Sequence, residues 1–288
     1  MEPTPEILCM GAAHWDVIGR STLAVAPGDD VPGRVRESPG GVALNIARGL
    51  AQTGCATALL AAIGADPAGD ALSDLLARDG VQTRHLHRPA HLPTDRYLAI
   101  EDTQGLIAAI ADSTTLEQTG AAILAPLLTG ALKDWRGTVV LDCGLPAQAL
   151  ARLRDAALSR LTLRLASASP AKVARLRLFL GTSAVFYLNR AEASALLAQD
   201  FPDSRSAAMA LVAAGAARAL VTDGARPATD ADGVALISSS PPPVTATRIT
   251  GAGDAFIAAH IAAEHRAAPR DAALAAALAQ AARHISSP

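Results

Sequence analysis

Short, continuously apolar runs alternate with alanine-rich helical stretches along most of this sequence. Each apolar run ends in a small or polar residue, which is typical of buried strands in a parallel sheet. The alternation predicts an α/β fold with a doubly wound, mostly parallel sheet and helices on both faces. The predicted strands lie at residues 6–10, 56–63, 138–141, 161–166, 184–188 and 218–221, and predicted helices at 43–53, 70–79, 147–159 and 204–214.

Two regions interrupt this alternation. Residues 16–38 are rich in glycine and proline, and residues 94–110 have the pattern of a β-hairpin that turns at residues 102–105. We expect these segments to build a small β-sheet lid on a single domain that spans residues 1–288. Ligands of open α/β sheets bind beyond the carboxyl ends of the strands, where such a lid would be well placed.

Composition narrows the possible partners. The 288-residue chain carries a formal net charge of −2 without a long basic or acidic run, so we expect neither nucleic acid nor a membrane surface as a partner. The sequence shows no signal-peptide pattern and no apolar window long enough to span a bilayer. Cys9, Cys55 and Cys143 match neither a disulfide framework nor a zinc site, which favours the cytoplasm.

The stretch TRITGAGDAFIAAHIAAE at residues 247–264 combines a glycine turn with the start of a helix. If the helix begins near Ala252, the amides of Ala252, Gly253 and Asp254 can hold an anion. A carboxylate beside an anion site repels the anion, so its presence there needs a functional reason. Taking a proton from a hydroxyl that attacks phosphorus would be such a reason. Alternatively, Asp254 only caps the helix and the glycines only form the turn.

Known phosphate-binding motifs do not explain this stretch. Phe256 occupies the position of the third glycine of a dinucleotide fingerprint, and neither Lys133 nor Lys172 follows a glycine as a Walker A lysine does.

Two further sequence patterns are expected to have a structural role rather than a catalytic or metal-binding one. The sequence around Asp230 and Gly233 is expected to form a turn, and His260 is expected to pack or lie at the surface rather than act as a second base.

Five ordered blocks carry a resemblance to a known family. TGAGDAF at residues 250–256 resembles the C-terminal signature of the PfkB, or ribokinase-like, carbohydrate and nucleoside kinases, and PGGVALNIARGLAQTG at 39–54 resembles their N-terminal signature. The other blocks are IGADPAGDALSDLLARDGV at 63–81, YLNRAEASALL at 187–197 and VTDG at 221–224. The resemblance covers nearly the whole chain and implies a ribokinase-like fold and an ATP-dependent kinase.

The resemblance also implies roles for the phosphate-handling residues. Asp254 would be the catalytic base, and Gly251, Ala252 and Gly253 would form the anion hole with the Asp254 amide. Asn189 and Glu192 match an N-x-x-E pair that organises Mg²⁺ and phosphate through water, although these residues would also suit an ordinary capped helix start. Thr222 and Gly224 would contact the nucleotide, together with Asn189 and Gly253.

The acceptor site follows from the same resemblance. Asp16, Gly40, Gly41 and Asn45 match the family's sugar site, and a carboxylate with an amide suits a polyol. One departure is Arg248, which stands where many members carry an acidic residue, so dependence on a monovalent cation stays open.

Finer similarity within the family concerns the substrate. Residues 16–47, 94–112 and 139–150 resemble pseudouridine kinases, which implies transfer of phosphate to the 5′-hydroxyl of a C-nucleoside. Another nucleoside, or a free sugar such as ribose or a ketohexose, is the alternative acceptor. A nonenzymatic nucleoside or sugar sensor is the alternative from a different class. Analogy with the fold also predicts a homodimer.

Overall fold

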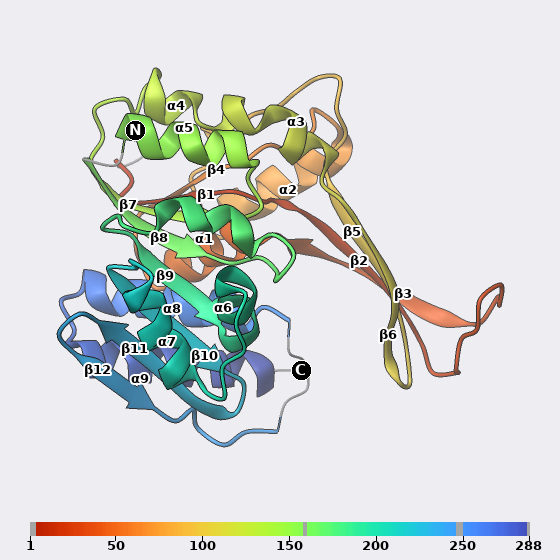
Figure 1. Ribbon diagram of the computed structural model, residues 1–288. Coiled ribbons are helices and arrows are strands. Elements are labelled where there is room, and N and C mark those ends of the chain that lie inside the picture. The colour runs from red at the N-terminus through yellow and green to blue at the C-terminus, as the bar shows by residue number, and fades with distance from the viewer. Residues whose placement is uncertain (1–3, 158–159, 246–249, 287–288) are drawn as a thin grey trace.

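The computed structural model describes residues 4–157, 160–245 and 250–286. Its strands form two separate sheets (Figure 1). The main sheet has eight strands in the order β12-β11-β10-β9-β8-β7-β1-β4, and the small sheet has four in the order β3-β2-β5-β6. The α/β architecture expected from the alternating sequence pattern is confirmed.

Six strands of the main sheet run parallel and coincide with the predicted ones. They are β1 (Ile7–Met10), β4 (Thr57–Leu60), β7 (Gly137–Asp142), β8 (Leu161–Ala166), β9 (Val185–Asn189) and β10 (Arg218–Asp223). Neighbouring side chains of β1 pack on opposite faces of the sheet. Leu8 and Met10 join one hydrophobic core, whereas Ile7 and Cys9 join the other. Both faces are buried, which explains why the predicted strands are continuously apolar.

Helices cover both faces of the main sheet. One core receives side chains from α3 (Thr114–Ile123), α5 (Ala147–Ala157), α6 (Arg190–Leu197) and α7 (Ser204–Ala213). The other receives side chains from α1 (Val42–Gln52), α2 (Pro67–Arg78), α8 (Ala252–His265) and α9 (Arg270–Ser286). The short α4 (Ala125–Leu128) and the 3₁₀ helix η2 (Val173–Phe179) complete the described helices. None of the helices in the described ranges combines the length and apolar character needed to cross a bilayer.

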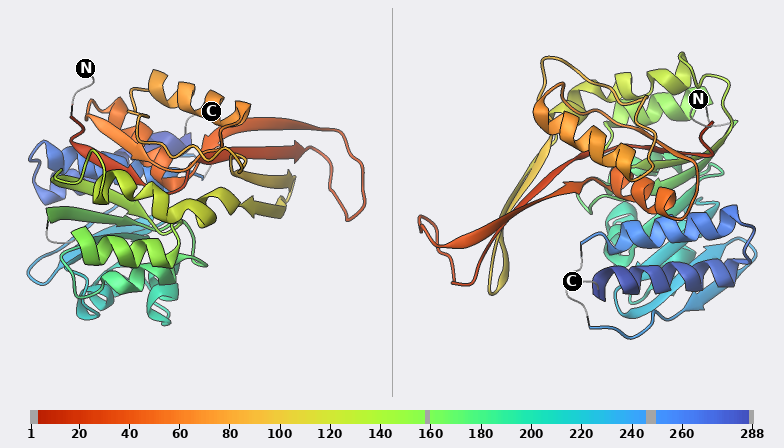
Figure 2. Two further views of the ribbon diagram at one scale, coloured as in Figure 1. Left: turned by 90° about the horizontal axis from the view of Figure 1, so that it is seen from above. Right: turned by 180° about the vertical axis from the view of Figure 1, so that it is seen from behind.

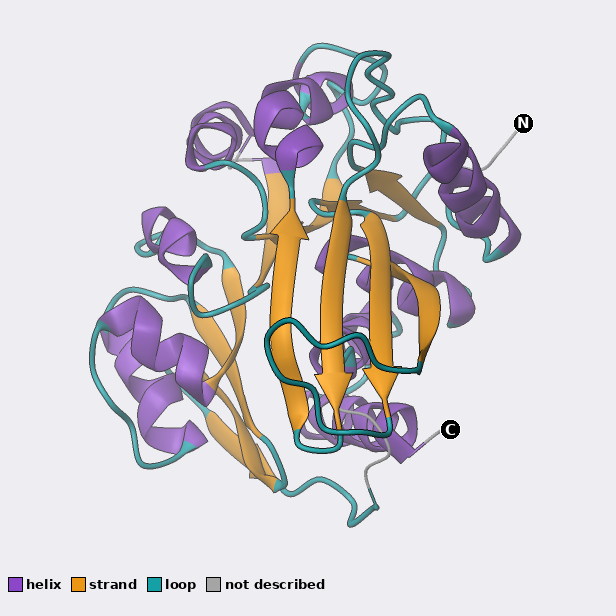
Figure 3. Cartoon of the chain, turned by 90° about the vertical axis from the view of Figure 1, so that its right-hand side faces the viewer, coloured by secondary structure: helices purple, strands orange, loops and turns teal. Residues whose placement is uncertain are grey.

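The small sheet projects from the body beside the edge of the main sheet (Figure 2). It is built from β2 (His14–Ser21), β3 (Gly33–Gly40), β5 (Arg96–Asp102) and β6 (Gly105–Asp112). The predicted hairpin is confirmed, since Asp102 pairs with Gly105 where β5 turns into β6. Figure 3 looks onto the side from which this sheet projects and shows its strands in the foreground.

The predicted turn at residues 230–233 is wrong. Asp230 and Asp232 belong to β11 (Arg226–Asp232), which pairs antiparallel with β10 and with β12 (Leu236–Ser239), and the chain bends only from Gly233 onward. Asp230 is fully buried, but Arg218 Nε and Arg270 Nη2 each donate to its carboxylate at 2.7 Å. These two arginines come from β10 and α9, and their charges neutralise the buried carboxylate. The local sequence alone marks this aspartate as a turn residue, because its partners lie elsewhere in the chain.

Candidate active site

A cleft of about 1120 Å³ extends from the small sheet along α1 and α8 and reaches α9. Asp16, Asn45, Gly251 and Asp254, four of the predicted site residues, line it together. They come from β2, α1 and α8, and nearly the whole chain length separates the first from the last. The cleft therefore brings together two of the predicted acceptor residues, Asp16 and Asn45, and the predicted base, whereas Gly40 and Gly41 do not line it.

The start of α1 delivers Asn45 to this cleft. Gly41, the residue before the helix, has a φ of 102°, and a Cβ on it would overlap the carbonyl oxygen of Ala12, so a larger residue would be strained there. The amide of Asn45 donates to Gly41 O at 2.9 Å in the first turn of the helix. The side chain of Asn45 then donates from Nδ2 to Asp254 Oδ2 at 2.9 Å.

Asp254 lies in the first turn of α8, as the glycine turn predicts. The helix begins at Ala252, and Gly251 adopts a left-handed conformation with a φ of 83° immediately before it. The pKa of the Asp254 carboxyl is raised to about 7, chiefly by burial and to a lesser degree by the negative charges of Asp142, Glu192 and Asp16, while the hydrogen bond from Asn45 lowers it. A carboxyl with such a pKa can accept a proton near neutral pH.

Asp16 occupies the small-sheet side of the cleft. Its Oδ1 lies 3.1 Å from His14 Nε2 on the same strand, and β3 runs antiparallel beside it. A Cβ on Gly40 would overlap the Asp16 carboxylate. Gly40 therefore makes room for the acid that the resemblance assigns to the acceptor, which is a packing reason for the glycine.

The predicted nucleotide and magnesium residues lie at the carboxyl ends of β9 and β10. Asn189 and Glu192 form a capping box at the start of α6, with both reciprocal hydrogen bonds at 2.8 Å. Glu192 is buried, and burial raises its carboxyl pKa. Thr222 ends β10 with Asp223, and Gly224 follows with a φ of 62°. These residues do not line the cleft, although the charge of Glu192 acts on Asp254.

The described ranges contain no cluster of three His, Cys, Asp or Glu side chains that could bind a metal ion. The role of Glu192 toward Mg²⁺ stays a prediction. Arg248, the departure within the motif, lies outside the described residues.

His260 is a packing residue, as expected. It is fully buried on α8, its Nδ1 lies 3.0 Å from the Tyr187 hydroxyl, and its ring stacks on Phe256. Burial lowers its pKa to about 4, so it is neutral at pH 7.

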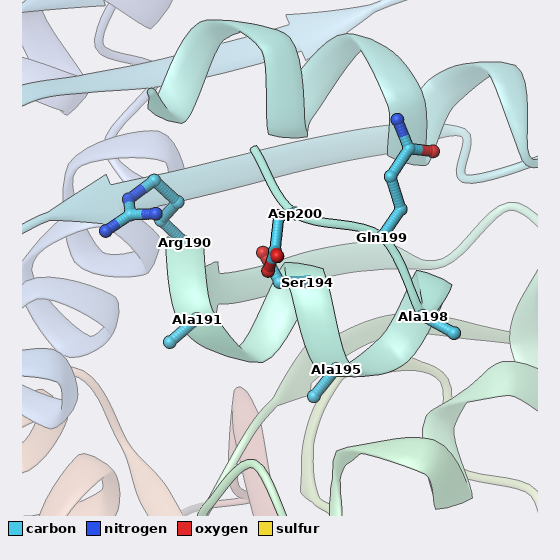
Figure 4. Close-up of a pocket in the computed structure, with 7 residues that line it drawn as sticks. All are labelled: Arg190, Ala191, Ser194, Ala195, Ala198, Gln199 and Asp200. Carbon is cyan, nitrogen blue, oxygen red and sulfur yellow. The ribbon is translucent and has the colours of Figure 1, made fainter. Parts of the chain in front are cut away.

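A second hollow lies on the outer side of α6 (Figure 4). It contains none of the predicted site residues, and Arg190 at its rim is held by Asp223 and by the carbonyl of Phe201. The lining residues are Arg190, Ala191, Ser194, Ala195, Ala198, Gln199 and Asp200.

Sequence reasoning missed one residue that acts on the site. Asp142 is noticed only as the polar residue after a strand, yet it is fully buried beside the start of α1 and its charge acts on Asp254. The signal that could have found it is its position at the carboxyl end of a central strand.

Comparison with known proteins now decides the family. A model of the pfkB family of carbohydrate kinases matches residues 4–288. This chain belongs to that family. The ribokinase-like fold expected from the resemblance is confirmed by solved structures of ribokinase-type kinases. A carbohydrate kinase from Agrobacterium tumefaciens is 28% identical, with a TM-score of 0.84 over 99% of this chain and 92% of that one.

Two relatives from Escherichia coli strain K12 are similar over shorter stretches. Its pseudouridine kinase is 31% identical over 150 residues, which cover 52% of this chain and 47% of that protein. Its uncharacterized sugar kinase YeiI is 35% identical over 146 residues, which cover 49% of this chain and 39% of that protein. The match thus spans about half the length or less of these curated relatives.

The raised pKa of Asp254 predicts a stability cost that depends on pH. The unfolded chain ionises this carboxyl near its ordinary pKa of 3.8 and the folded chain near about 7, so ionisation removes folding free energy as pH rises between these values. Asp254→Asn should therefore stabilise the protein at pH 8, by up to roughly 4 kcal/mol, and much less at pH 4. Urea unfolding at both pH values measures this difference, with Asp155→Asn as the control on an exposed aspartate. An equal effect of Asp254→Asn at both pH values would contradict the assignment.

Proposed function

We propose that this protein is an ATP-dependent kinase that transfers the γ-phosphoryl group to a primary hydroxyl of a nucleoside or sugar, with the 5′-hydroxyl of pseudouridine as the leading acceptor. One observation carries the proposal. The Asp254 carboxylate lies at the start of α8, is held by Asn45, and shares its cleft with Asp16. A base beside a helix N-terminus and a polyol-binding acid is the arrangement that phosphoryl transfer to a hydroxyl needs.

Each of these residues has a distinct task in the proposed reaction. Asp16 accepts hydrogen bonds from acceptor hydroxyls and orients the acceptor in the cleft. Asp254 takes the proton of the attacking hydroxyl as the bond to the γ-phosphorus forms and the bond from that phosphorus to the β,γ-bridging oxygen breaks, which releases ADP. The amides of Ala252, Gly253 and Asp254 stabilise the negative charge on the transferred group, and each such donor is worth roughly 2.7–4 kcal/mol in comparable sites.

The donor chemistry beside β9 fits Mg²⁺. This ion keeps several waters and uses one or two carboxylates, so the single buried Glu192 with the Asn189 amide would hold it through water. When bound, Mg²⁺ would offset negative charge on the nucleotide phosphates. Thr222 and Gly224 at the end of β10 would face the nucleotide, with Gly224 permitting close approach of the backbone.

Similarity to two kinds of relative bears on the acceptor. Resemblance to a pseudouridine kinase favours a C-nucleoside, whereas the sugar kinase and the carbohydrate kinase among the similar proteins favour ribose or a ketohexose as the alternative. A sensor without turnover is disfavoured by Asp254, because a half-buried carboxylate among three others costs stability and would bring a sensor no benefit.

An ADP-release assay with Mg-ATP tests this proposal. We expect turnover with pseudouridine, compared with uridine, adenosine, ribose and fructose. Asp254→Asn should lower kcat by about 10²- to 10⁴-fold, because it removes the general base, while ATP binding is nearly unchanged. Asp155→Asn, the same chemical change at an exposed site, should leave kcat unaltered. Turnover with ribose alone would exclude pseudouridine, an active Asp254→Asn would exclude the base, and no turnover with any acceptor would favour the sensor.

We also propose that two copies associate through the small sheet. Alternate residues of β2 line the cleft, so the other face of this sheet points away from it. The strand register places Val35, Leu98, Ile100 and Ile110 on that outward face, and Val35 and Ile110 are 71% and 66% exposed. A second copy would cover these apolar side chains with an identical apolar face.

Light scattering tests this association. Ile110→Asp places a charge in the outward face and should convert a dimer into a monomer, because burial of an unpaired charge is costly. Val234→Asp is the matched control, since Val234 is 98% exposed at the bend between β11 and β12. A wild-type monomer, or a dimer that survives Ile110→Asp, would contradict the proposal.

A further inference from the structure

Asp142 is a fully buried carboxylate at the carboxyl end of β7, an interior strand of the main sheet between β8 and β1. It accepts three backbone hydrogen bonds: Oδ2 from the amides of Ala12 at 2.8 Å and Ala43 at 3.0 Å, and Oδ1 from Gly144 at 2.7 Å. These amides belong to three segments, namely the exit of β1, the first turn of α1 and the exit of β7. One side chain therefore joins the carboxyl ends of β1 and β7 to the start of α1.

The surroundings of Asp142 are shaped around its carboxylate. A Cβ on Gly11 or on Gly144 would overlap it, so glycines on both sides leave the space that it fills. The start of α1 needs such a partner, because Gly41 precedes the helix and has no side chain with which to cap it. Asp142 supplies this cap from a distant part of the chain, and its negative charge suits the positive end of the helix.

The contacts of Asp142 lead to Asn45, a predicted acceptor residue, and through it to Asp254, the predicted base. Ala43 lies two residues before Asn45, whose side chain holds Asp254. Ala12 also accepts from the amide of Leu44 at 3.3 Å, so the exit of β1 and the first turn of α1 are bound to each other as well as to Asp142. A shift of this turn would displace Asn45 from Asp254.

We propose that Asp142 is a positioning residue, whose carboxylate fixes the first turn of α1 and thereby places Asn45 against Asp254. Asp142 does not touch the reacting atoms in this account. It acts through Asn45, and the inference deepens the proposed kinase function on which it rests.

Three variants test this role. Asp142→Asn keeps the size of the side chain, but its amide nitrogen cannot accept a hydrogen bond and would face a backbone N–H. Asp95→Asn is the matched control, because Asp95 is also buried and accepts from the amides of Thr115 and Leu116 at the start of α3, which does not line the cleft. Asn45→Ala removes the side chain through which Asp142 is proposed to act.

Hydrogen–deuterium exchange measures the positioning without any turnover. Asp142→Asn should speed exchange by about fivefold or more in the peptide that covers residues 41–47, because the first turn of α1 loses its cap. Asp95→Asn should speed exchange at residues 114–118 and leave 41–47 unchanged. Unaltered exchange at 41–47 in Asp142→Asn would overturn the proposal. If that chain does not fold, Asp142→Ser, which is smaller and retains an acceptor oxygen, takes its place with the same expectation.

A double-mutant cycle in kcat then tests whether Asp142 acts through Asn45. Asp142→Asn should lower kcat by about 10-fold or more in the wild-type background and by less than about threefold in Asn45→Ala, with the KM for ATP nearly constant in both. Equal losses in the two backgrounds would overturn the proposal, since a merely structural role would add to the loss from Asn45→Ala. If the wild-type protein turns over none of the acceptors, the proposed kinase function fails, and the exchange experiment still decides the role of Asp142.

Discussion

The hydrogen bond between Asn45 and Asp254 is the contact on which the site depends. It joins the first turns of α1 and α8 with a length of 2.9 Å. The two residues lie 209 positions apart in the sequence. Both helices line the same cleft, and this bond holds Asn45 and Asp254 together near the ends at which the two helices begin. Without this bond, Asp254 would be one more acidic residue in the first turn of a helix.

Burial and like charges set the pKa of Asp254. Burial is the larger cause, and the charges of Asp142 on β7, Glu192 on α6 and Asp16 on β2 add to it, so that the pKa is raised to about 7. A carboxyl with its ordinary pKa would be a weak base toward a sugar hydroxyl, whereas one near neutrality is better matched to the proton that it must take. Because the pKa of Asp254 is raised, its ionised form costs folding stability.

The strands and the helix starts could be predicted because local rules decide them. Continuous apolar runs predict β1 correctly, since both of its faces are buried, and the glycine turn before Asp254 correctly places the start of α8. Asp230 could not be predicted, because its buried charge is neutralised by arginines from β10 and α9. Asp142 likewise has partners that are distant in the sequence, namely backbone amides of three separate segments.

The pH dependence of kcat/KM for the acceptor, at saturating Mg-ATP, tests the central claim most directly. This parameter reports ionisations of the protein before the acceptor binds, so it should rise with pH and level off with a midpoint near the Asp254 pKa of about 7. The rise reflects loss of the proton from Asp254, and Asp254→Asn should lose it together with most of the activity. A kcat/KM that is independent of pH between about 5.5 and 8.5, or the same rise in Asp254→Asn, would contradict the account.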